Sequence, residues 1–266
     1  MVGGTAIAPR RARAVLEVAV PGGRVAFVER GAGVPVLFLH GGTGTGEFDW
    51  GAVADHLSRR GYRTIVPDLR GHGVSRNDEP GLGVVRFGLD SAHVLRAAGV
   101  PRAVHVGFSV GGNTFLALLA RDVRPALALV TIGASAKGDP SKVERIMTGP
   151  WPDYLTGLEH AVADRPEYWK HLRAQLARDW ATNVDLSPGA GARITCPVLV
   201  CHGTDDRVQP VDYAHHLVAQ LPDAELWLAE GAGHAVQLDQ PDEFVARLEE
   251  FLARALAPSR NGARLG

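Results

Sequence analysis

Short apolar runs alternate with longer amphipathic runs along most of this chain, and this alternation constrains the fold more than any other feature. The segment 34–40, VPVLFLH, is apolar at nearly every position, which is typical of a strand buried on both faces of a sheet. Similar runs recur after segments that are long enough to form helices. The sequence therefore predicts an α/β fold, with a mostly parallel sheet and helices on both of its faces.

The individual segments can be assigned from their apolar pattern and from the turn residues between them. The first two strands flank a Pro-Gly-Gly turn and predict a β-hairpin, and Gly61 and Gly99 mark the ends of two helices. The expected strands are 14–20, 24–31, 34–40, 63–69, 102–109, 126–134, 197–203 and 224–231. The expected helices are about 47–60, 82–98, a segment that includes 113–120, 210–221 and 241–256.

The alternation breaks between residues 136 and 190, where short helical patterns surround a group of large aromatic residues. We expect an α/β core built from residues 1–135 and 191–266, with 136–190 inserted as a small helical cap over the edge where strands end. Pockets are lined mainly by apolar and aromatic side chains, so Trp151 and Trp169 are candidate substrate-binding residues. Packing of the cap on the sheet would explain the aromatic residues equally well.

The composition excludes several classes of partner. Of the 266 residues, 45% are apolar and 21% charged, and the formal net charge is -1. A protein that binds nucleic acid or an anionic membrane usually has a basic excess, which is missing here. No apolar run approaches the length of a membrane span, and the N-terminus lacks the apolar core of a signal peptide. We expect a cytoplasmic protein that acts on a small molecule, in an oligomeric state that the sequence leaves open.

The two cysteines, Cys196 and Cys201, lie in or beside one expected strand. Five residues of extended chain separate them by about 16 Å, which is too far for a disulfide. We interpret both as small core residues in a reduced compartment. No group of cysteines and histidines has the spacing of a metal site, so we expect neither a metal nor another cofactor.

A serine stands at the centre of the glycine-rich sequence GFSVGG (107–112), between an expected strand and an expected helix. A hydroxyl is a weak nucleophile and must be held where a base can reach it. A sharp strand-to-helix turn lifts the serine oxygen off the end of the sheet, and the glycines relieve crowding there. The motif therefore marks Ser109 as a candidate nucleophile. A glycine-rich turn with an incidental serine is the alternative that the motif alone leaves open.

Two further loops follow strands and would meet Ser109 at the same edge of the sheet. In HGGT (40–43), small residues allow a backbone N–H to turn toward the serine. Gly42 and Val110 are then the expected N–H donors to an oxyanion, and His40 is expected to be structural. No Gly-Lys-Ser/Thr follows, which argues against a phosphate-binding loop. In GAGH (231–234), a glycine-rich turn after the last strand makes His234 the candidate base.

A third loop, GTDDRV (203–208), carries two adjacent carboxylates. A carboxylate there could hold an imidazole in the correct tautomer and stabilise its charged form. Aspartate also favours turns for its own hydrogen bonds, so the loop by itself does not decide between Asp205 and Asp206. The chain order is serine, aspartate, histidine.

Together these motifs resemble the α/β-hydrolase superfamily, over residues 14–256. The sequence DLRGHG (68–73) adds to the resemblance, with His72 in a structural role. The resemblance implies a serine hydrolase with Ser109 as nucleophile, His234 as base, and Gly42 and Val110 as the oxyanion hole. Its Gly-x-x-Asp spacing selects Asp206 as the acid. A serine nucleophile argues against the dehalogenases and epoxide hydrolases of the same fold, which use aspartate.

The small cap resembles that of esterases, lactonases and carbon-carbon bond hydrolases in this superfamily. We expect cleavage of a carboxylic ester through an acyl-enzyme, on a substrate with an apolar acyl or aryl part. Three alternatives remain open. A carbon-carbon bond hydrolase acting on a vinylogous diketone would use the same residues, a lactonase differs only in its substrate, and a small-molecule receptor would bind with little turnover.

Overall fold

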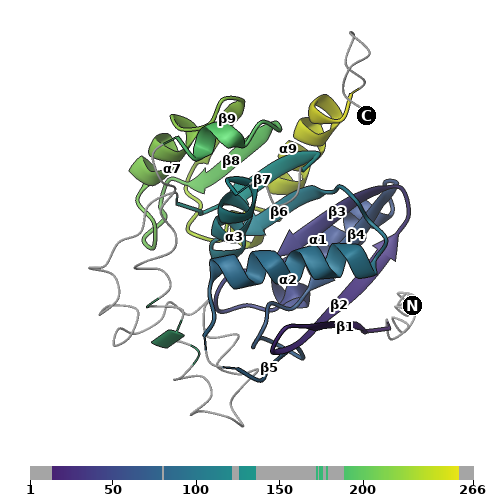
Figure 1. The fold of residues 1–266 in the computed structure, drawn as a ribbon. Coiled ribbons are helices and arrows are strands. Elements are labelled where there is room, and N and C mark those ends of the chain that lie inside the picture. Colours follow the sequence, from purple (N-terminus) through teal and green to yellow (C-terminus); the bar gives the residue numbers. More distant parts are fainter. Residues whose placement is uncertain are drawn as a thin grey trace, which may run out of the picture.

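The computed structural model describes residues 14–79, 81–121, 126–135, 172, 174–175, 178 and 189–257. Within these residues the strands form one nine-stranded, mostly parallel sheet, with helices packed on both faces (Figure 1). The strands are β1 (Leu16–Val20), β2 (Gly23–Gly31), β3 (Val34–Leu39), β4 (Tyr62–Pro67), β5 (Arg76–Asn77), β6 (Val104–Phe108), β7 (Ala128–Ile132), β8 (Val198–Gly203) and β9 (Ala224–Ala229). The described helices are α1 (Gly46–Ser58), α2 (Val84–Ala97), α3 (Val110–Leu119), the 3₁₀ helix η2 (Gly191–Arg193), α7 (Val211–Val218), α8 (Val236–Asp239) and α9 (Pro241–Ala255).

The order of the strands reverses direction at the centre of the sheet. The order is β1-β2-β4-β3-β6-β7-β8-β9, with β5 paired to β2. The pairs from β4 through β3 and β6 to β9 are parallel, whereas β2 is antiparallel to β1, β4 and β5. After β3 the chain adds β4 on one side and later β6 on the other. This reversal makes the carboxyl ends of β3 and β6 the place where a ligand is expected to bind.

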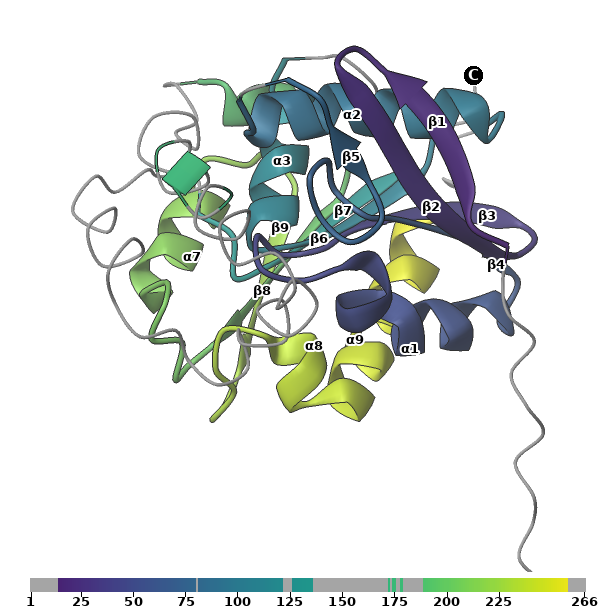
Figure 2. The same ribbon diagram turned by 90° about the horizontal axis from the view of Figure 1, so that it is seen from below.

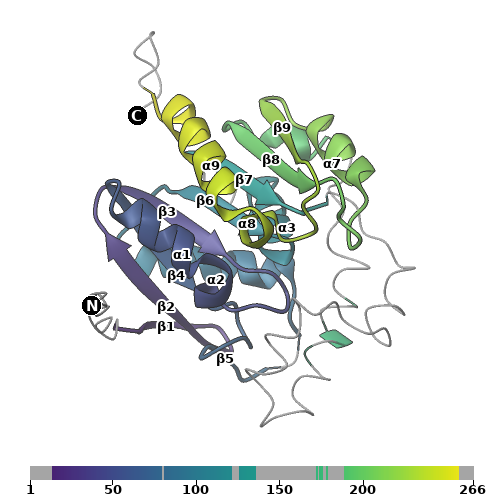
Figure 3. The same ribbon diagram turned by 180° about the vertical axis from the view of Figure 1, so that it is seen from behind.

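The sheet separates two hydrophobic cores. Figure 2 shows α2 and α3 on one face and α1, α8 and α9 on the other. Successive residues of a strand point to opposite faces, as in β8: Val198 and Val200 pack toward α2, α3 and α7, whereas Leu199 and Cys201 pack toward α1 and α9. Helix α9 lies in front of the central strands β6 and β7 in Figure 3, which shows the sheet from behind. Because both faces of the central strands are covered, the strands are apolar at nearly every position.

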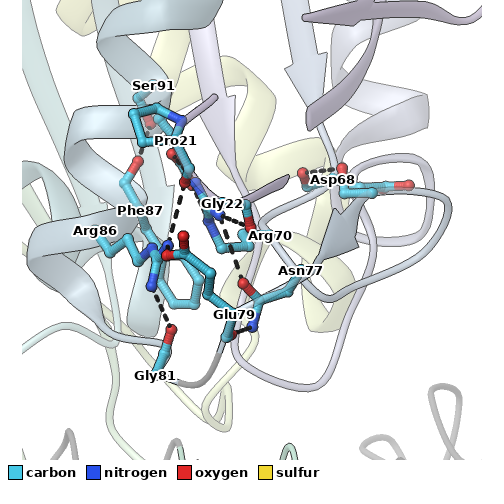
Figure 4. A network of polar contacts seen from close by, with 12 residues as sticks. Pro21, Gly22, Asp68, Arg70, Asn77, Glu79, Gly81, Arg86, Phe87 and Ser91 are labelled. Atoms are coloured by element: carbon cyan, nitrogen blue, oxygen red, sulfur yellow. Dashed lines mark hydrogen bonds and ion pairs between the residues drawn. The ribbon is translucent and has the colours of Figure 1, made fainter. Parts of the chain in front are cut away.

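A buried arginine links the N-terminal hairpin to the loop after β4 and to helix α2. Arg70, in the loop after β4, forms two hydrogen bonds with the carboxylate of Asp90 in α2, at 2.8 and 2.6 Å. A third hydrogen bond runs 2.7 Å from the same guanidinium to the carbonyl of Gly22, in the turn between β1 and β2 (Figure 4). Both charged side chains are almost completely buried, with exposures of 1% and 6%. One residue therefore links three separate segments of the chain.

The predicted α/β architecture is confirmed, and the differences are local. Three short elements were not expected from the sequence: β5, the 3₁₀ helix η2, and the single turn of α8 just after His234. The expected strand 102–109 ends at Phe108, so that Ser109 stands outside it. Cys201 is fully buried and Cys196 partly buried, and both are free thiols.

The expected cap, 136–190, lies outside the described residues except for Leu172, Ala174, Gln175, Arg178 and 189–190. Of these, Leu172 packs into the core formed with α2 and α3. The division into core and cap therefore stays a prediction. None of the helices in the described ranges is both long and apolar enough to cross a membrane.

Candidate active site

The serine of the GFSVGG motif lies at a strained turn between β6 and α3. Its backbone φ is 50°, and among the described residues it is the only one other than glycine with a positive φ. Non-glycine residues in such conformations cost of order 1–3 kcal/mol and cluster at functional sites. The Ser109 N–H donates to the carbonyl of Ile132 in β7 at 2.7 Å, and the Ser109 carbonyl accepts from the N–H of Asn113 in the first turn of α3. The neighbouring strand and the new helix thus hold the turn in place.

The glycines of the motif allow the chain to fold back so sharply. A Cβ atom on Gly107 would lie 2.6 Å from the backbone of Gly111, and one on Gly111 would lie 2.3 Å from the carbonyl oxygen of Leu39 in β3. Real Cβ contacts are never that short. Both positions therefore require glycine, which brings the start of α3 against the end of β3.

The imidazole of His234 forms a hydrogen bond with a carboxylate from another loop. His234 Nδ1 lies 2.8 Å from Asp206 Oδ2, and the two side chains have exposures of 3% and 0%. Asp205, by contrast, is exposed, and its backbone N–H donates to the carbonyl of Ala232. Of the two candidate acids, the structure brings Asp206 to His234.

The other oxygen of Asp206 is also held. Asp206 Oδ1 accepts from the N–H groups of Val208 and Gln209, at 2.8 and 2.9 Å. Burial alone would raise the pKa of Asp206, but the hydrogen bond and charge of His234 and the N–H of Gln209 outweigh it, so that the pKa lies below its usual range. An ionised carboxylate only accepts hydrogen bonds, so in the neutral imidazole the hydrogen is on Nδ1 and the free lone pair is on Nε2.

Residues at the carboxyl end of β7 contact both the His234 imidazole and the backbone of Ser109. A Cβ atom on Gly133, which directly follows β7, would lie 2.8 Å from His234 Nδ1, so the ring packs on bare backbone there. The preceding residue, Ile132, accepts the hydrogen bond from Ser109 N–H. The rings of Phe108 and His234 are 5.1 Å apart. Among the described contacts there is no hydrogen bond between Ser109 Oγ and His234, and in ligand-free sites such bonds often tighten only when substrate binds.

The two expected oxyanion donors lie beside the turn that carries Ser109. Val110 is the first residue of α3, and the first N–H groups of a helix have no intrahelical partner. Gly42 lies in the loop between β3 and α1, and its N–H forms no hydrogen bond with any other described residue. Both N–H groups are thus available to donate hydrogen bonds to a ligand oxygen, and the positive end of the α3 dipole adds to the field there.

Two buried histidines support the loop between β3 and α1. His40 Nε2 accepts from the N–H of Leu69 at 2.8 Å, and its Nδ1 donates to the carbonyl of Gly41 at 2.6 Å. His72 Nε2 lies 3.0 Å from the carbonyl of Gly42. Burial lowers the pKa of both imidazoles, which keeps them neutral. These contacts agree with the structural roles expected for His40 and His72.

Sequence reasoning missed a second histidine beside the acid. His202, the penultimate residue of β8, places its Nε2 2.9 Å from the carbonyl of Gln209 and 3.3 Å from Asp206 Oδ2. Burial lowers its pKa, so that it is neutral. A single histidine in an apolar strand gives no sequence signal, and only the fold brings it to the acid. In the part of the chain that the structure describes, no group of three or more histidine, cysteine or acidic residues could hold a metal ion.

The candidate cap residues Trp151 and Trp169 lie outside the described residues. Their contacts with substrate therefore stay a prediction.

Comparisons with a family model, with curated relatives and with solved structures all lead to one family. Residues 36–247 match the model of the Alpha/beta hydrolase family. A non-heme haloperoxidase of Rhodococcus erythropolis is 27% identical over 87% of this chain and 96% of its own. A 2-hydroxymuconate semialdehyde hydrolase of Pseudomonas putida is 26% identical over 90% of this chain and 94% of its own.

Solved structures show the same fold. A thermophilic esterase from Thermogutta terrifontis superposes with a TM-score of 0.74 at 23% identity, over 92% of this chain and 99% of the esterase. The family match, the sheet order and the strand-turn-helix around Ser109 agree with one another. This chain belongs to the alpha/beta hydrolase family.

Proposed function

We propose that this protein is a serine hydrolase that cleaves a carboxylic ester with an apolar acyl or aryl part through an acyl-enzyme. The observation that carries the proposal is the hydrogen bond between Asp206 and His234, buried at the sheet edge where Ser109 stands. An ionised acid on Nδ1 leaves Nε2 able to take the serine proton. This is the arrangement that activates a serine hydroxyl.

In the acylation step, Ser109 Oγ attacks the ester carbonyl carbon while its proton passes to His234 Nε2. The carbonyl oxygen becomes an oxyanion, which the N–H groups of Gly42 and Val110 stabilise. The bond to the alcohol oxygen then breaks, and the imidazolium gives its proton to the departing alcohol. The serine is left esterified to the acyl group.

Deacylation repeats these steps with water. His234 Nε2 takes a proton from a water molecule, whose oxygen attacks the acyl carbon. The tetrahedral intermediate collapses, Ser109 Oγ recovers a proton from the imidazolium, and the carboxylic acid leaves. The ionised carboxylate of Asp206 stabilises the imidazolium in both halves of the cycle.

A second candidate is hydrolysis of a carbon-carbon bond in a vinylogous diketone, which the same residues would serve. The semialdehyde hydrolase among the relatives, at 26% identity, favours this candidate. An enzyme of this kind would cleave such a diketone and leave simple esters intact, whereas a lactonase would prefer cyclic esters. Parallel assays with the three substrate types distinguish these possibilities.

The test combines turnover with covalent labelling. A series of p-nitrophenyl esters of increasing acyl length should be hydrolysed, with a preference that reports the size of the acyl pocket expected from residues 136–190. A fluorophosphonate should add to Ser109, as located by peptide mass spectrometry. Ser109→Ala should lower kcat by roughly 10⁴–10⁶-fold, and Ser58→Ala, a half-buried serine on α1, should leave it unchanged.

Each outcome has a defined meaning once circular dichroism shows that the variants are folded. An adduct on a residue other than Ser109 overturns the assignment of the nucleophile. A labelled Ser109 without ester turnover, together with cleavage of the diketone, would replace ester hydrolysis by the second candidate. Tight binding of substrates with no turnover of any of them would indicate a receptor.

A further inference from the structure

An aspartate that the proposed reaction does not use is buried against the loop that carries Gly42. Asp49 belongs to α1, is 4% exposed, and its Oδ2 accepts a hydrogen bond of 2.8 Å from the N–H of Gly41. It is not the N-cap of the helix, because Thr45 fills that position. Burying a carboxyl group costs free energy unless it is hydrogen-bonded, and the hydrogen bond of this one comes from the loop beside the sheet edge.

The loop is folded tightly around this carboxyl group. Gly44 N–H donates to the carbonyl of Gly41 at 3.2 Å and closes the turn. A Cβ atom on Gly44 would lie 2.5 Å from Asp49 Oδ2, so only glycine leaves room for the carboxyl group. A Cβ atom on Gly41 would lie 2.8 Å from the ring of Phe108, next to Ser109. The turn is therefore held between Asp49 on one side and the Ser109 segment on the other.

Three consecutive peptide units of this loop are each held by a side chain. Asp49 accepts from the N–H of the 40–41 unit, His40 donates to the carbonyl of the 41–42 unit, and His72 Nε2 lies 3.0 Å from the carbonyl of the 42–43 unit. The N–H of Gly42 belongs to the middle unit. A trans peptide is planar, and its N–H points opposite to its C=O. Fixing the Gly41 carbonyl and both flanking units thus fixes the direction of the Gly42 N–H.

We propose that Asp49 is a positioning residue for the oxyanion hole, whose carboxyl group holds the Gly41–Gly42 turn so that the Gly42 N–H points at the reacting oxygen of the substrate. The inference rests on the proposed function, because it takes Gly42 as an oxyanion donor. Burial raises the pKa of Asp49 to about 7, against the effect of the Gly41 N–H. The hydrogen bond needs an acceptor oxygen, which a neutral amide also supplies.

The test uses the rate at which a fluorophosphonate reacts with Ser109, because this reaction places a phosphoryl oxygen in the same hole and needs no knowledge of the natural substrate. Asp49→Leu removes the acceptor and should lower the maximal labelling rate on the order of 10- to 100-fold, less than the loss of a whole donor. The half-saturating concentration of the reagent should stay the same. Asp49→Asn keeps an acceptor oxygen and should label within about threefold of the parent protein.

A matched control separates positioning from stability. Asp55 is also a buried aspartate of α1, but it forms an ion pair of 2.8 Å with Arg30 in β2. Asp55→Leu should lower the melting temperature and leave the labelling rate of the folded protein unchanged. If Asp49→Leu does not fold, Asp49→Ser takes its place, since a serine side chain is too short to reach the Gly41 N–H.

The outcomes distinguish the inference from the function beneath it. Absence of labelling at Ser109 in the parent protein overturns the proposed function. Normal labelling in the parent, with an equal rate in folded Asp49→Leu or Asp49→Ser, overturns the role of Asp49 and leaves the proposed function standing. A loss of rate in Asp49→Asn as large as in Asp49→Leu also contradicts the role, because the acceptor oxygen is then not what matters.

Discussion

The two adjacent aspartates in the loop after β8 differ in burial and in contact with His234, and a catalytic acid needs that contact. The Asp206 side chain is fully buried and reaches His234, whereas Asp205 is exposed and contributes a backbone N–H to the turn. Asp205 lies in the turn after β8 and is exposed, so only Asp206 presents its carboxylate to the imidazole. Asp206 is therefore the candidate acid, although Asp205 is its direct neighbour in the sequence.

Asparagine at these two positions should have opposite consequences. In Asp206→Asn, the amide NH₂ facing His234 Nδ1 would favour the tautomer with its hydrogen on Nε2, which cannot take the serine proton. We expect kcat to fall on the order of 10²–10⁴-fold, while Oδ1 can still accept from Val208 and Gln209. Asp205→Asn should cost less than about tenfold, because it alters only turn contacts.

Both variants should be assayed at one pH on the best p-nitrophenyl ester, with circular dichroism as a check of folding. If Asp205→Asn is the impaired variant, the acid must be reassigned to Asp205, and the roles of Ser109 and His234 would not be affected.

At the scale of elements, the contact between β6 and α3 contains an ionisable ring. His105 of β6 stacks on Phe115 of α3, with ring centroids 4.4 Å apart and planes at 18°. It is 1% exposed, and burial lowers its pKa to about 3. In the unfolded chain a histidine titrates near pH 6.5. Between these two values the unfolded state binds a proton that the folded state does not, so stability falls as the pH falls through this range.

Replacing this imidazole should change how stability depends on pH. Well below pH 6.5, one such proton changes the free energy of unfolding by about 1.4 kcal/mol per pH unit. His105→Phe keeps a ring against Phe115 and should reduce the slope of the unfolding free energy by about this amount between about pH 4 and 6. The remaining slope would come from other groups, including His40, His72 and His202, whose pKa values burial also lowers.

Urea unfolding at several pH values measures the slope. The difference between the two proteins at pH 8, where the imidazole is neutral in both states, reports packing alone. Parallel curves for the two proteins over the acid range would show that His105 is protonated in the folded state as readily as in the unfolded one.

At the scale of the whole molecule, Arg70 joins the N-terminal hairpin, the loop after β4 and helix α2. Breaking a buried ion pair by removing one partner leaves an uncompensated charge and costs about 3–5 kcal/mol. Arg70→Met should therefore lower the free energy of unfolding by about this amount. The double variant Arg70→Met, Asp90→Leu should recover most of the loss, because neither charge remains buried.

Denaturant curves for the single and double variants give the coupling between the two sites. A loss below 1 kcal/mol in Arg70→Met would mean that water reaches Asp90 in the variant. The small space beside this pair, lined by Leu39, Phe87 and Val94 among others, is where that water would enter.

From the sequence alone, the α/β architecture and the loops that carry the candidate site residues could be predicted. Apolar runs at the right spacing predict central strands, because a strand covered on both faces has no polar side to show. The glycines around Ser109 predict the sharp turn, because they stand where a Cβ atom would collide with backbone. The loop after β8 did not by itself decide between Asp205 and Asp206; the spacing implied by the family resemblance favoured Asp206, and it is Asp206 that contacts His234. These features are local, so the local sequence carries them.

The tertiary structure alone decided which side chains support those residues. His202 lies beside Asp206, Asp49 holds Gly41, and His72 holds Gly42 across a separation of thirty positions. No periodicity or motif predicts such contacts, because each depends on where two segments lie once the sheet has formed. The two-residue strand β5 and the single turn of α8 are likewise too short for a pattern. Their conformation follows from the packing around them rather than from their own residues.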